Sequence, residues 1–379
     1  MRHYCLACSL LLFWLPPAGA GEQFVFFGTY TGAKSQGVYV SRFDPATGRL
    51  TPPELAADIR NPSFLALHPN ERYLYTVGEA AEAQDKGNGS VSAFAIDAQT
   101  GKLTLINRHS SGGGEPCHLA VDAKGKCVLA ANYGSGSVAV LPIHADGSLG
   151  APATTIQHTG SSVNPQRQAG PHAHFICPAP DNRFALACDL GLDRVIAYQL
   201  DLNGPTLNPA KPEFATVAPG AGPRHLTFSP DGKFVYVINE MISSIVVFRY
   251  DAKSAALTEV QTISTLPKDA ATTSYCAEIA MHLTGQFLYG SNRGHDSIAV
   301  FAVDRKSGRL TSLEYTTTQG KTPRHFAIDP TGRWLLAENQ GSDSVVLFSI
   351  DAVTGKLKPA GQTVTVGSPV CAVFLGGRP

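Results

Sequence analysis

Short apolar segments recur along this chain, and polar turns separate them at regular intervals. Residues 223–251 contain an apolar strand, a Pro-Asp-Gly turn, a second apolar strand and a third strand of Ser-Ile-Val-Val-Phe pattern. Residues 323–351 contain the same elements in the same order, with a Pro-Thr-Gly turn. Because β-branched and aromatic residues dominate these segments, we expect them to be strands. The pattern therefore predicts a repeated β unit.

The same unit recurs four more times, as the positions of its first turn show. Successive turns are separated by 47 (Gly285 to Gly332) to 57 (Gly125 to Asn182) residues. Asn, Asp and Gly favour such turns because they tolerate positive φ. The predicted turns are Asn70-Glu71, Lys124-Gly125, Asp181-Asn182, Asp231-Gly232, Thr284-Gly285 and Thr331-Gly332.

Each unit is predicted to be a four-stranded antiparallel sheet. The second strand returns from the first turn, and a loop of Asn, Ser, Gly and Asp leads to the third strand. The third strands are expected at Ser90–Phe94, Ser137–Leu141, Ser244–Phe248, Ser297–Phe301 and Ser344–Phe348. A Gly-Lys-Leu or Gly-Arg-Leu turn then leads to an outer fourth strand, with the glycine at Gly48, Gly101, Gly308 or Gly355.

Six complete units extend from Pro62 to about Pro359, and a seventh is divided between the two ends of the chain. Residues 24–50 contain only the later strands of a unit, and the missing inner strand is found at residues 369–374. Pairing of the two ends would close a ring and leave no open sheet edge. A linear solenoid would need capping units, and a miscounted unit would give six or eight blades. We therefore predict an all-β, seven-bladed β-propeller in a single domain, residues 21–379.

The first 20 residues have the composition of a secretory signal peptide. Arg2 and His3 precede an apolar run from Leu6 to Leu15, and Ala18-Gly19-Ala20 supplies small residues before a cleavage point. The run is too short to cross a membrane, and the alternative is a buried N-terminal helix. Cleavage after Ala20 would give a periplasmic or secreted protein with no membrane attachment.

The composition of the chain limits its partners. Lys and Arg total 30, and Asp and Glu total 30, so no overall field attracts nucleic acid or an anionic membrane. Six cysteines follow the predicted leader, all in apolar segments where cysteine packs as a small hydrophobic residue. An oxidising compartment permits disulfides, and the sequence leaves that question open. Because that part of the chain has no CxxC pair and no His/Cys cluster, we expect no metal site.

Polar residues gather where the first strand of each unit begins and the second strand ends. These two points lie at the same end of an antiparallel hairpin, so in a ring they meet at one mouth of the channel. The strand starts contribute His118, His172, His174, Arg224, His225, Glu278, Arg324 and His325. The strand ends contribute Glu79, Asn132, Tyr133, Asp189, Asn239, Glu240, Asn292, Arg293, Asn339 and Gln340. Each could simply hydrogen-bond to backbone, but several charges in one small cavity are costly unless they bind something.

Motifs in this set resemble those of the lactonase seven-bladed propeller family. That family includes bacterial propeller-type 6-phosphogluconolactonases and fungal carboxy-cis,cis-muconate lactonising enzymes, and the resemblance covers residues 24–375. The motifs are Gly28-Thr29-Tyr30-Thr31, Asn132-Tyr133-Gly134-Ser135-Gly136, Gly170-Pro171-His172-Ala173-His174, Gly222-Pro223-Arg224-His225, Val237-Ile238-Asn239-Glu240 and Ser291-Asn292-Arg293-Gly294-His295.

The resemblance implies a lactone site at the channel mouth, without a cofactor or a metal. By motif position, the catalytic residues would be His174, Arg224, Glu240 and Arg293. Substrate would be bound by His172, His225, Asn239, Asn292, Tyr133, Arg324, His325 and Gln340. Ala173 and Glu338 depart from the family pattern and leave the identity of the substrate open.

These residue types suit the opening of a lactone, which needs a water nucleophile, a base and cations for the developing oxyanion. Glu240 or His174 would be the base, and Arg224 and Arg293 would stabilise the negative charge. The sequence has no Gly-x-Ser-x-Gly nucleophile elbow on a strand-to-helix turn. We therefore predict a hydrolase of sugar lactones, similar to 6-phosphogluconolactonase, and export favours an unphosphorylated substrate.

Two other functions are also compatible with the sequence. A muconate-type cycloisomerase would form the lactone bond on an unsaturated diacid, and the same arginines would bind its carboxylates. A non-enzymatic propeller would bind a ligand or a protein partner, and we would then expect apolar patches on one face. The polar mouth favours an enzyme with a small-molecule substrate. The sequence does not determine the oligomeric state.

Overall fold

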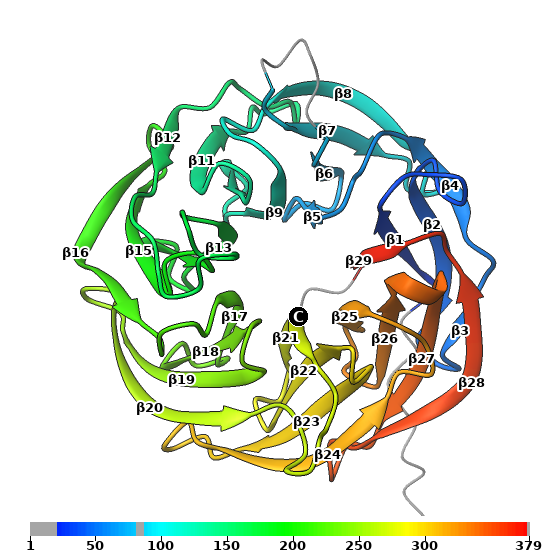
Figure 1. Cartoon of the computed structure of the whole chain (residues 1–379). Helices are drawn as coiled ribbons and strands as arrows, with labels where there is room; N and C mark the ends of the chain where they lie inside the picture. The colour runs from blue at the N-terminus through cyan, green and yellow to red at the C-terminus, as the bar shows by residue number, and fades with distance from the viewer. Residues whose placement is uncertain (1–20, 81–86, 377–379) are drawn as a thin grey trace, which may run out of the picture.

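In the computed structural model, the chain forms seven antiparallel sheets arranged in a ring about a central axis (Figure 1). The structure describes residues 21–80 and 87–376, so the predicted leader, residues 1–20, lies outside the described residues. Within the described ranges there is no α-helix, and hence no helix long and apolar enough to span a membrane. The predicted seven-bladed β-propeller is confirmed.

Six blades follow one another along the chain, and each takes its four strands in sequence order. Blade 2 contains β5 (Leu65–Leu67), β6 (Tyr73–Gly78), β7 (Ser90–Ile96) and β8 (Leu103–Ser110). Blade 3 contains β9 (Pro116–Val121), β10 (Cys127–Asn132), β11 (Ser137–Pro142) and β12 (Thr154–Gln157). Blade 4 contains β13 (Ala173–Pro178), β14 (Phe184–Asp189), β15 (Arg194–Asp201) and β16 (Thr206–Thr216).

The next three blades repeat this order. Blade 5 contains β17 (Pro223–Phe228), β18 (Phe234–Asn239), β19 (Ser244–Asp251) and β20 (Ala256–Ser264). Blade 6 contains β21 (Tyr275–Met281), β22 (Phe287–Arg293), β23 (Ser297–Val303) and β24 (Leu310–Thr317). Blade 7 contains β25 (Pro323–Ile328), β26 (Trp334–Asn339), β27 (Ser344–Ile350) and β28 (Leu357–Thr365), with the 3₁₀ helix η2 (Gln340–Ser342) after its second strand.

Blade 1 combines strands from both ends of the chain. The C-terminal strand β29 (Pro369–Leu375) is innermost and pairs with β1 (Gln23–Thr29). β1 pairs with β2 (Gly37–Asp44), which in turn pairs with β3 (Arg49–Leu50) and β4 (Glu54–Asp58). β29 therefore supplies the inner strand that the N-terminal segment lacks, as predicted, and the ring is closed by strand pairing.

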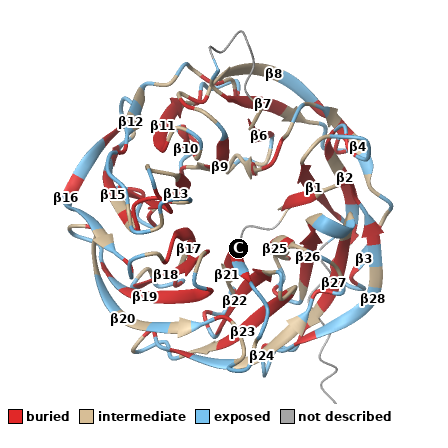
Figure 2. Ribbon diagram, viewed as in Figure 1, coloured by how far each residue is buried: buried red, intermediate tan, exposed pale blue. Residues whose placement is uncertain are grey.

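Seven apolar clusters fill the spaces between neighbouring blades in the described part of the chain. The cluster between blades 7 and 1 joins Val25, Phe27 and Phe43 to Leu336 and Val345. Buried residues concentrate on the inner strands and exposed ones on the outermost strands (Figure 2), so β18 is buried throughout whereas β20 is not. The closing interface therefore has the same apolar construction as the other six.

The predicted turns form where the sequence pattern placed them. Each first turn contains one residue with positive φ, namely Glu71, Gly125, Asn182, Gly232, Gly285 or Gly332. The glycines before the fourth strands have φ between 71° and 76° at Gly48, Gly101, Gly308 and Gly355. At Gly308 a Cβ atom would lie 2.4 Å from the ring of Phe234, so this glycine also lets blades 5 and 6 approach each other.

The six cysteines of the described ranges are all free thiols, and five of them are buried. Cys127, for example, packs in the apolar cluster between blades 3 and 4. Within these ranges, strand pairing and apolar packing therefore hold the propeller together without disulfides.

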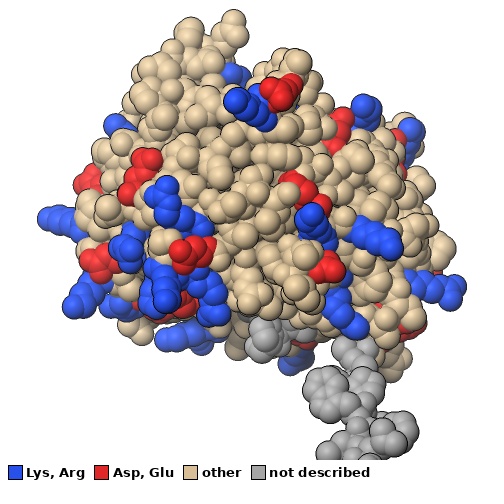
Figure 3. Space-filling view, turned by 90° about the horizontal axis from the view of Figure 1, so that it is seen from below, with Lys and Arg blue, Asp and Glu red and all other residues tan. Residues whose placement is uncertain are grey.

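Charges of both signs share the outer surface. On the face shown in Figure 3, Lys and Arg side chains are interspersed with Asp and Glu. This distribution agrees with the equal totals of 30 basic and 30 acidic residues in the sequence.

Deleting residues 369–379 would remove the innermost strand of blade 1. We expect the shortened chain to lose its cooperative thermal unfolding transition, because β1 becomes an open edge and Val25 and Phe27 lose part of their cover. As a control, a circular permutant joins the two ends and opens the chain within residues 268–271. It keeps every strand pair, so it should unfold close to the wild-type temperature in the same calorimetric scan. If the shortened chain keeps the unfolding transition of the wild type, the ring is not closed by β29.

Candidate active site

A β-bulge near the start of the innermost strand sets the direction of several side chains at the channel mouth. In blade 5, Pro223 pairs with Asn239 and His225 pairs with Ile238, so Arg224 is an extra residue between two paired positions. Such residues leave the strand ladder, and bulges often re-aim side chains beside active sites. The same register shift occurs at Cys117 in blade 3, His174 in blade 4 and Arg324 in blade 7.

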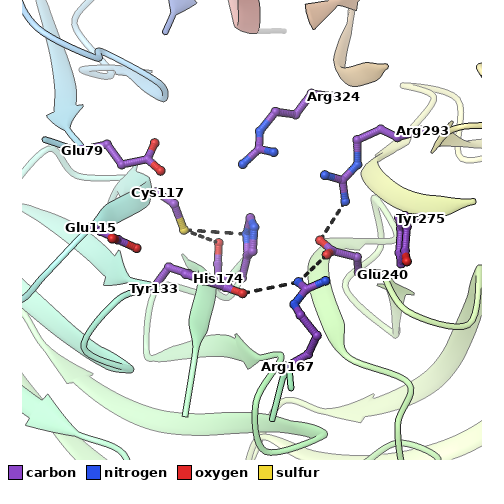
Figure 4. Close-up of a pocket in the computed structure, with 10 residues that line it drawn as sticks. All are labelled: Glu79, Glu115, Cys117, Tyr133, Arg167, His174, Glu240, Tyr275, Arg293 and Arg324. Atoms are coloured by element: carbon purple, nitrogen blue, oxygen red, sulfur yellow. Dashed lines mark hydrogen bonds and ion pairs between the residues drawn. The ribbon is translucent and has the colours of Figure 1, made fainter. Parts of the chain in front are cut away.

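A cavity of about 330 Å³ opens at this mouth (Figure 4). Its volume is at the lower end of the range of about 300–1,000 Å³ that is usual for ligand pockets, which suits a single small ring. Blades 2 to 7 all contribute to the wall. The lining residues are Glu79, Glu115, Cys117, Tyr133, Arg167, His174, Glu240, Tyr275, Arg293 and Arg324.

Glu240, directly after β18, holds three arginines from different elements. Its Oε1 accepts a hydrogen bond from Arg167 Nη2 at 2.7 Å. Its Oε2 lies 3.2 Å from Arg224 Nε and 2.8 Å from Arg293 Nη2. Burial alone would raise the pKa of Glu240, but the arginines outweigh burial and lower it to about 2. The carboxylate is therefore ionised at neutral pH and engaged by cations.

The arginines differ in their access to the cavity. Arg224 is 2% exposed, donates to the backbone oxygen of Ala277 at 2.7 Å and does not line the cavity. Burial, with the nearby Arg293 and Arg324, lowers its pKa to about 9. Arg293 does line the cavity, and its Nε is a buried donor without a partner in the described part of the chain. Leaving a buried donor unpaired is costly, and the guanidinium group that carries this nitrogen points into the cavity (Figure 4).

His174 borders the cavity and is 5% exposed. Its Nδ1 lies 3.7 Å from Cys117 Sγ, and its ring stands edge-on to Tyr133 with centroids 5.5 Å apart. Burial, and then the charge of Arg224, lowers the pKa of His174 well below its usual range. Burial raises the pKa of the Cys117 thiol, which keeps its proton. A neutral imidazole, able to accept a proton, therefore borders the cavity.

Two histidines and two glutamates fill the channel beneath this cavity. His225 Nδ1 lies 3.0 Å from Glu278 Oε2, and His325 Nε2 approaches the same oxygen at 3.5 Å. His325 Nδ1 lies 2.8 Å from Glu338 Oε2 and also accepts the backbone N–H of Ala372 at 3.3 Å. Because this nitrogen is an acceptor, the proton between it and Glu338 belongs to the carboxyl group.

Burial accounts for the protonation of this group. It raises the pKa of Glu338 well above its usual range and also raises that of Glu278. It lowers the pKa values of His225 and His325, which are therefore neutral. Arg224 Nη1 lies 3.3 Å from His225 Nε2, so the contacts extend continuously from Glu338 to Arg224, which supports Glu240 in the cavity wall.

The sequence-predicted substrate residues occupy different positions around the cavity. Tyr133 and Arg324 line it. His225 and His325 lie below it in the channel, in the group of histidines and glutamates. His172 stacks on the ring of Tyr133 with centroids 4.5 Å apart and bonds to its backbone oxygen, so it supports a lining residue.

Three other predicted residues are not part of the cavity wall. Asn239 is buried and donates to Ser244 Oγ, and Asn292 is buried and donates to the backbone oxygen of Thr265. Gln340 begins η2 and is half-buried outside the cavity. Asn292 thus has the backbone hydrogen bond that the sequence offered as the alternative to binding, whereas Asn239 bonds to a neighbouring side chain.

Sequence reasoning missed Arg167, Glu115, Cys117 and Tyr275 as residues of the site. Arg167 belongs to the 158–172 connection between blades 3 and 4, which Gln168 anchors by donating to Asp193 Oδ1 at 2.8 Å. The length of this connection was the available signal, because long loops in compact domains are often functional. Cys117 occupies the bulge position of its blade, and aligning the units at that position would have found it.

The fold and the cavity define a β-propeller with a small-molecule site at one mouth of its channel. The family model described as "Lactonase, 7-bladed beta-propeller" matches residues 24–374, and the chain belongs to this family. It is 39% identical over 350 residues to the 6-phosphogluconolactonase of Bacillus subtilis, which covers 92% of this chain and 97% of that protein.

Two solved structures show the same similarity. The periplasmic gluconolactonase of Pseudomonas aeruginosa superposes with a TM-score of 0.88 at 34% identity, covering 94% of this chain and 100% of its own. A putative 6-phosphogluconolactonase of Bacteroides fragilis has a TM-score of 0.87 at 36% identity, and the match covers 93% of this chain and 98% of that protein's chain. The propeller therefore has close structural relatives along almost the whole chain.

The protonated state of Glu338 predicts a pH-dependent effect of Glu338→Gln. Unfolding lets Glu338 ionise above about pH 4.3, so the wild type loses stability as the pH rises toward the raised pKa of the folded state. Glutamine cannot ionise, and its amide can still donate to His325 Nδ1. The melting temperature of Glu338→Gln, relative to wild type, should therefore be higher at pH 8 than at pH 5.

Glu259→Gln is the matched control for this measurement, because Glu259 is exposed on the outer strand β20. Its melting temperature relative to wild type should change little between the two pH values. If the difference in melting temperature between Glu338→Gln and the wild type is the same at pH 5 and pH 8, Glu338 is ionised in the folded protein.

Proposed function

We propose that this protein is a hydrolase that opens a sugar lactone at the channel mouth. The observation that carries the proposal is that a neutral buried imidazole, His174, and a guanidinium group, Arg293, belong to the wall of one cavity. A base and a charged hydrogen-bond donor are the groups that water attack on an ester carbonyl requires. The names of the relatives from Bacillus subtilis and Pseudomonas aeruginosa support the same activity.

In the proposed reaction, a water oxygen bonds to the lactone carbonyl carbon while His174 takes a proton from that water. Arg293 and Arg324 stabilise the negative charge that develops on the carbonyl oxygen. The ring C–O bond then breaks, and the leaving oxygen takes the proton back from His174. One lactone and one water thus give one hydroxy acid, and His174 returns to its neutral state.

Glu240 is assigned a positioning role in this scheme. Both oxygens of its carboxylate are engaged by arginines, so neither is free to take a proton from a water molecule. Its contacts with Arg167, Arg224 and Arg293 instead fix the direction of the guanidinium groups. Arg224 lies behind Glu240 and supports it from the channel side.

A cycloisomerase acting on an unsaturated diacid is less favoured by these contacts. Such a substrate brings two carboxylates, each of which would need a cationic partner. Three of the four arginines around the cavity are already paired with Glu240. A neutral lactone does not require these pairs to break.

We also propose that residues 1–20 are removed on export and that the propeller of residues 21–379 acts in the periplasm or outside the cell. The polar start, the apolar run and Ala18-Gly19-Ala20 support this proposal. The relative from Pseudomonas aeruginosa is described as periplasmic. An exported enzyme would encounter unphosphorylated sugar lactones.

The purified protein should hydrolyse D-glucono-1,5-lactone, measured as acid release at pH 7 after subtraction of spontaneous hydrolysis. Glu240→Gln should lower kcat/KM at least about 100-fold, because it removes the charge that aligns three arginines, and loss of one oxyanion donor alone costs about 10²–10³-fold. Glu259→Gln on the outer strand β20 is the control and should retain wild-type activity. An unchanged rate for Glu240→Gln would refute its role, and no turnover of any lactone, including a muconolactone, would favour a binding propeller.

Expression of the full chain in a Gram-negative host tests the proposed export. Protein recovered from the periplasm should begin at Gly21 when its N-terminus is sequenced. A variant that lacks residues 2–20 should stay in the cytoplasm with the same lactonase rate. Recovery of protein with Met1 intact in the cytoplasm would contradict the proposed leader.

A further inference from the structure

We propose that Glu79 forms a hydroxyl-binding subsite, which makes the cavity select an unphosphorylated, polyhydroxylated lactone over its phosphate ester. This inference rests on the proposed lactonase function and adds the residue that sets the substrate class. It is drawn from the arrangement of charges in the cavity, from the contacts of Glu79, and from one carboxylate oxygen that has no partner.

The cavity has an acidic wall and a basic wall. In Figure 4, Glu79 and Glu115 lie on one side, and Arg167, Arg293 and Arg324 lie across from them. With Glu240, the lining contains three carboxylates and three guanidinium groups, and Arg224 behind Glu240 brings the formal charge of the whole group to plus one while His174 is neutral. A neutral ligand leaves this balance unchanged, whereas a phosphate dianion adds two negative charges, more than the single surplus positive charge offsets.

Tyr30 holds the acidic and basic walls in a fixed relation. Its hydroxyl donates to Glu79 Oε1 at 3.1 Å and accepts from Arg324 Nη2 at 3.2 Å. The Arg324 guanidinium also lies over the Tyr30 ring, 5.5 Å from its centroid. A carboxylate acceptor and a guanidinium donor are thus positioned by the same side chain at the edge of the cavity.

The second oxygen of this carboxylate, Glu79 Oε2, is buried and has no hydrogen-bond partner among the described residues. Glu79 lines the cavity and rotation about the terminal bond of glutamate is broad, so a partial turn of the carboxylate would bring this enclosed oxygen to the cavity surface. An enclosed carboxylate oxygen without a donor is costly. A ligand that brings a donor would satisfy it.

A sugar hydroxyl fits this position because it both donates and accepts. It can donate to Glu79 and accept from Arg324 in the same contact. A phosphate dianion has only acceptors, so it would leave Glu79 Oε2 without a donor and would be repelled by the carboxylate. Because Arg167 and Arg293 are already engaged by Glu240, they offset this repulsion poorly. When the wrong substrate leaves a buried polar group of the protein unpaired, the difference in kcat/KM between the two substrates can be large.

The test compares kcat/KM for D-glucono-1,5-lactone and for its 6-phosphate in the wild type and in Glu79→Gln. We expect the wild type to prefer the unphosphorylated lactone by at least about tenfold. Glu79→Gln should lower kcat/KM for that lactone about 10- to 100-fold, mainly through KM, because a hydrogen bond to a charged group is lost. The value for the 6-phosphate should stay the same or rise, so the preference should fall at least about tenfold.

Glu115→Gln is the matched comparison. It removes an equal charge from the same wall, but Glu115 is exposed at the rim, so it reports the effect of charge alone and should shift the preference much less. Tyr30→Phe removes the anchor of Glu79 without changing any charge and should shift the preference in the same direction as Glu79→Gln. Calorimetric binding of D-gluconate and 6-phosphogluconate to the wild type gives an independent measure that needs no variant, with gluconate expected to bind more tightly.

The outcomes separate this inference from the proposed function. If the wild type hydrolyses neither lactone, the proposed function fails and the subsite fails with it. If it hydrolyses the 6-phosphate as well as or better than the unphosphorylated lactone, only the subsite proposal is overturned. The same conclusion follows if Glu79→Gln lowers both values of kcat/KM equally.

Discussion

The β-bulge at the start of the innermost strand is the constraint on which the cavity depends. An inner strand pairs on one side only, so an extra residue there turns toward the channel without breaking a second ladder. Cys117, His174, Arg224 and Arg324 all occupy this position in their blades. One backbone irregularity, repeated around the ring, therefore brings different side chains from separate blades to one mouth.

Charge balance explains how these side chains can be buried together. Glu240 contacts three arginines at once, and their combined field keeps it ionised despite its burial, while Glu79 and Glu115 add two further carboxylates to the cavity lining. Beneath it, the histidines are neutral and Glu338 keeps its proton, so the channel carries little charge that needs compensation. The result is a cavity in which charged side chains, such as Arg293 and Arg324, surround a space of ligand size.

The apolar clusters between blades make this arrangement rigid. Each cluster is shared by two neighbouring blades, so no blade has a complete core of its own. The ring must close before the last cluster can form, and β29 closes it by pairing with β1. The mouth is consequently held by all seven blades, although the residues that line the cavity come from only six of them.

The sequence by itself determined the number of blades, the six first turns and the closure by residues 369–374, because these depend on local periodicity and on turn residues that tolerate positive φ. It also indicated that His174, Arg224, Glu240 and Arg293 gather at one mouth. Only the tertiary structure decided which side chains face the cavity. Arg167 arrives from a connection outside the repeat, and Asn239 turns inward to Ser244. Such placements depend on loop paths and on contacts between blades, which local sequence patterns do not encode.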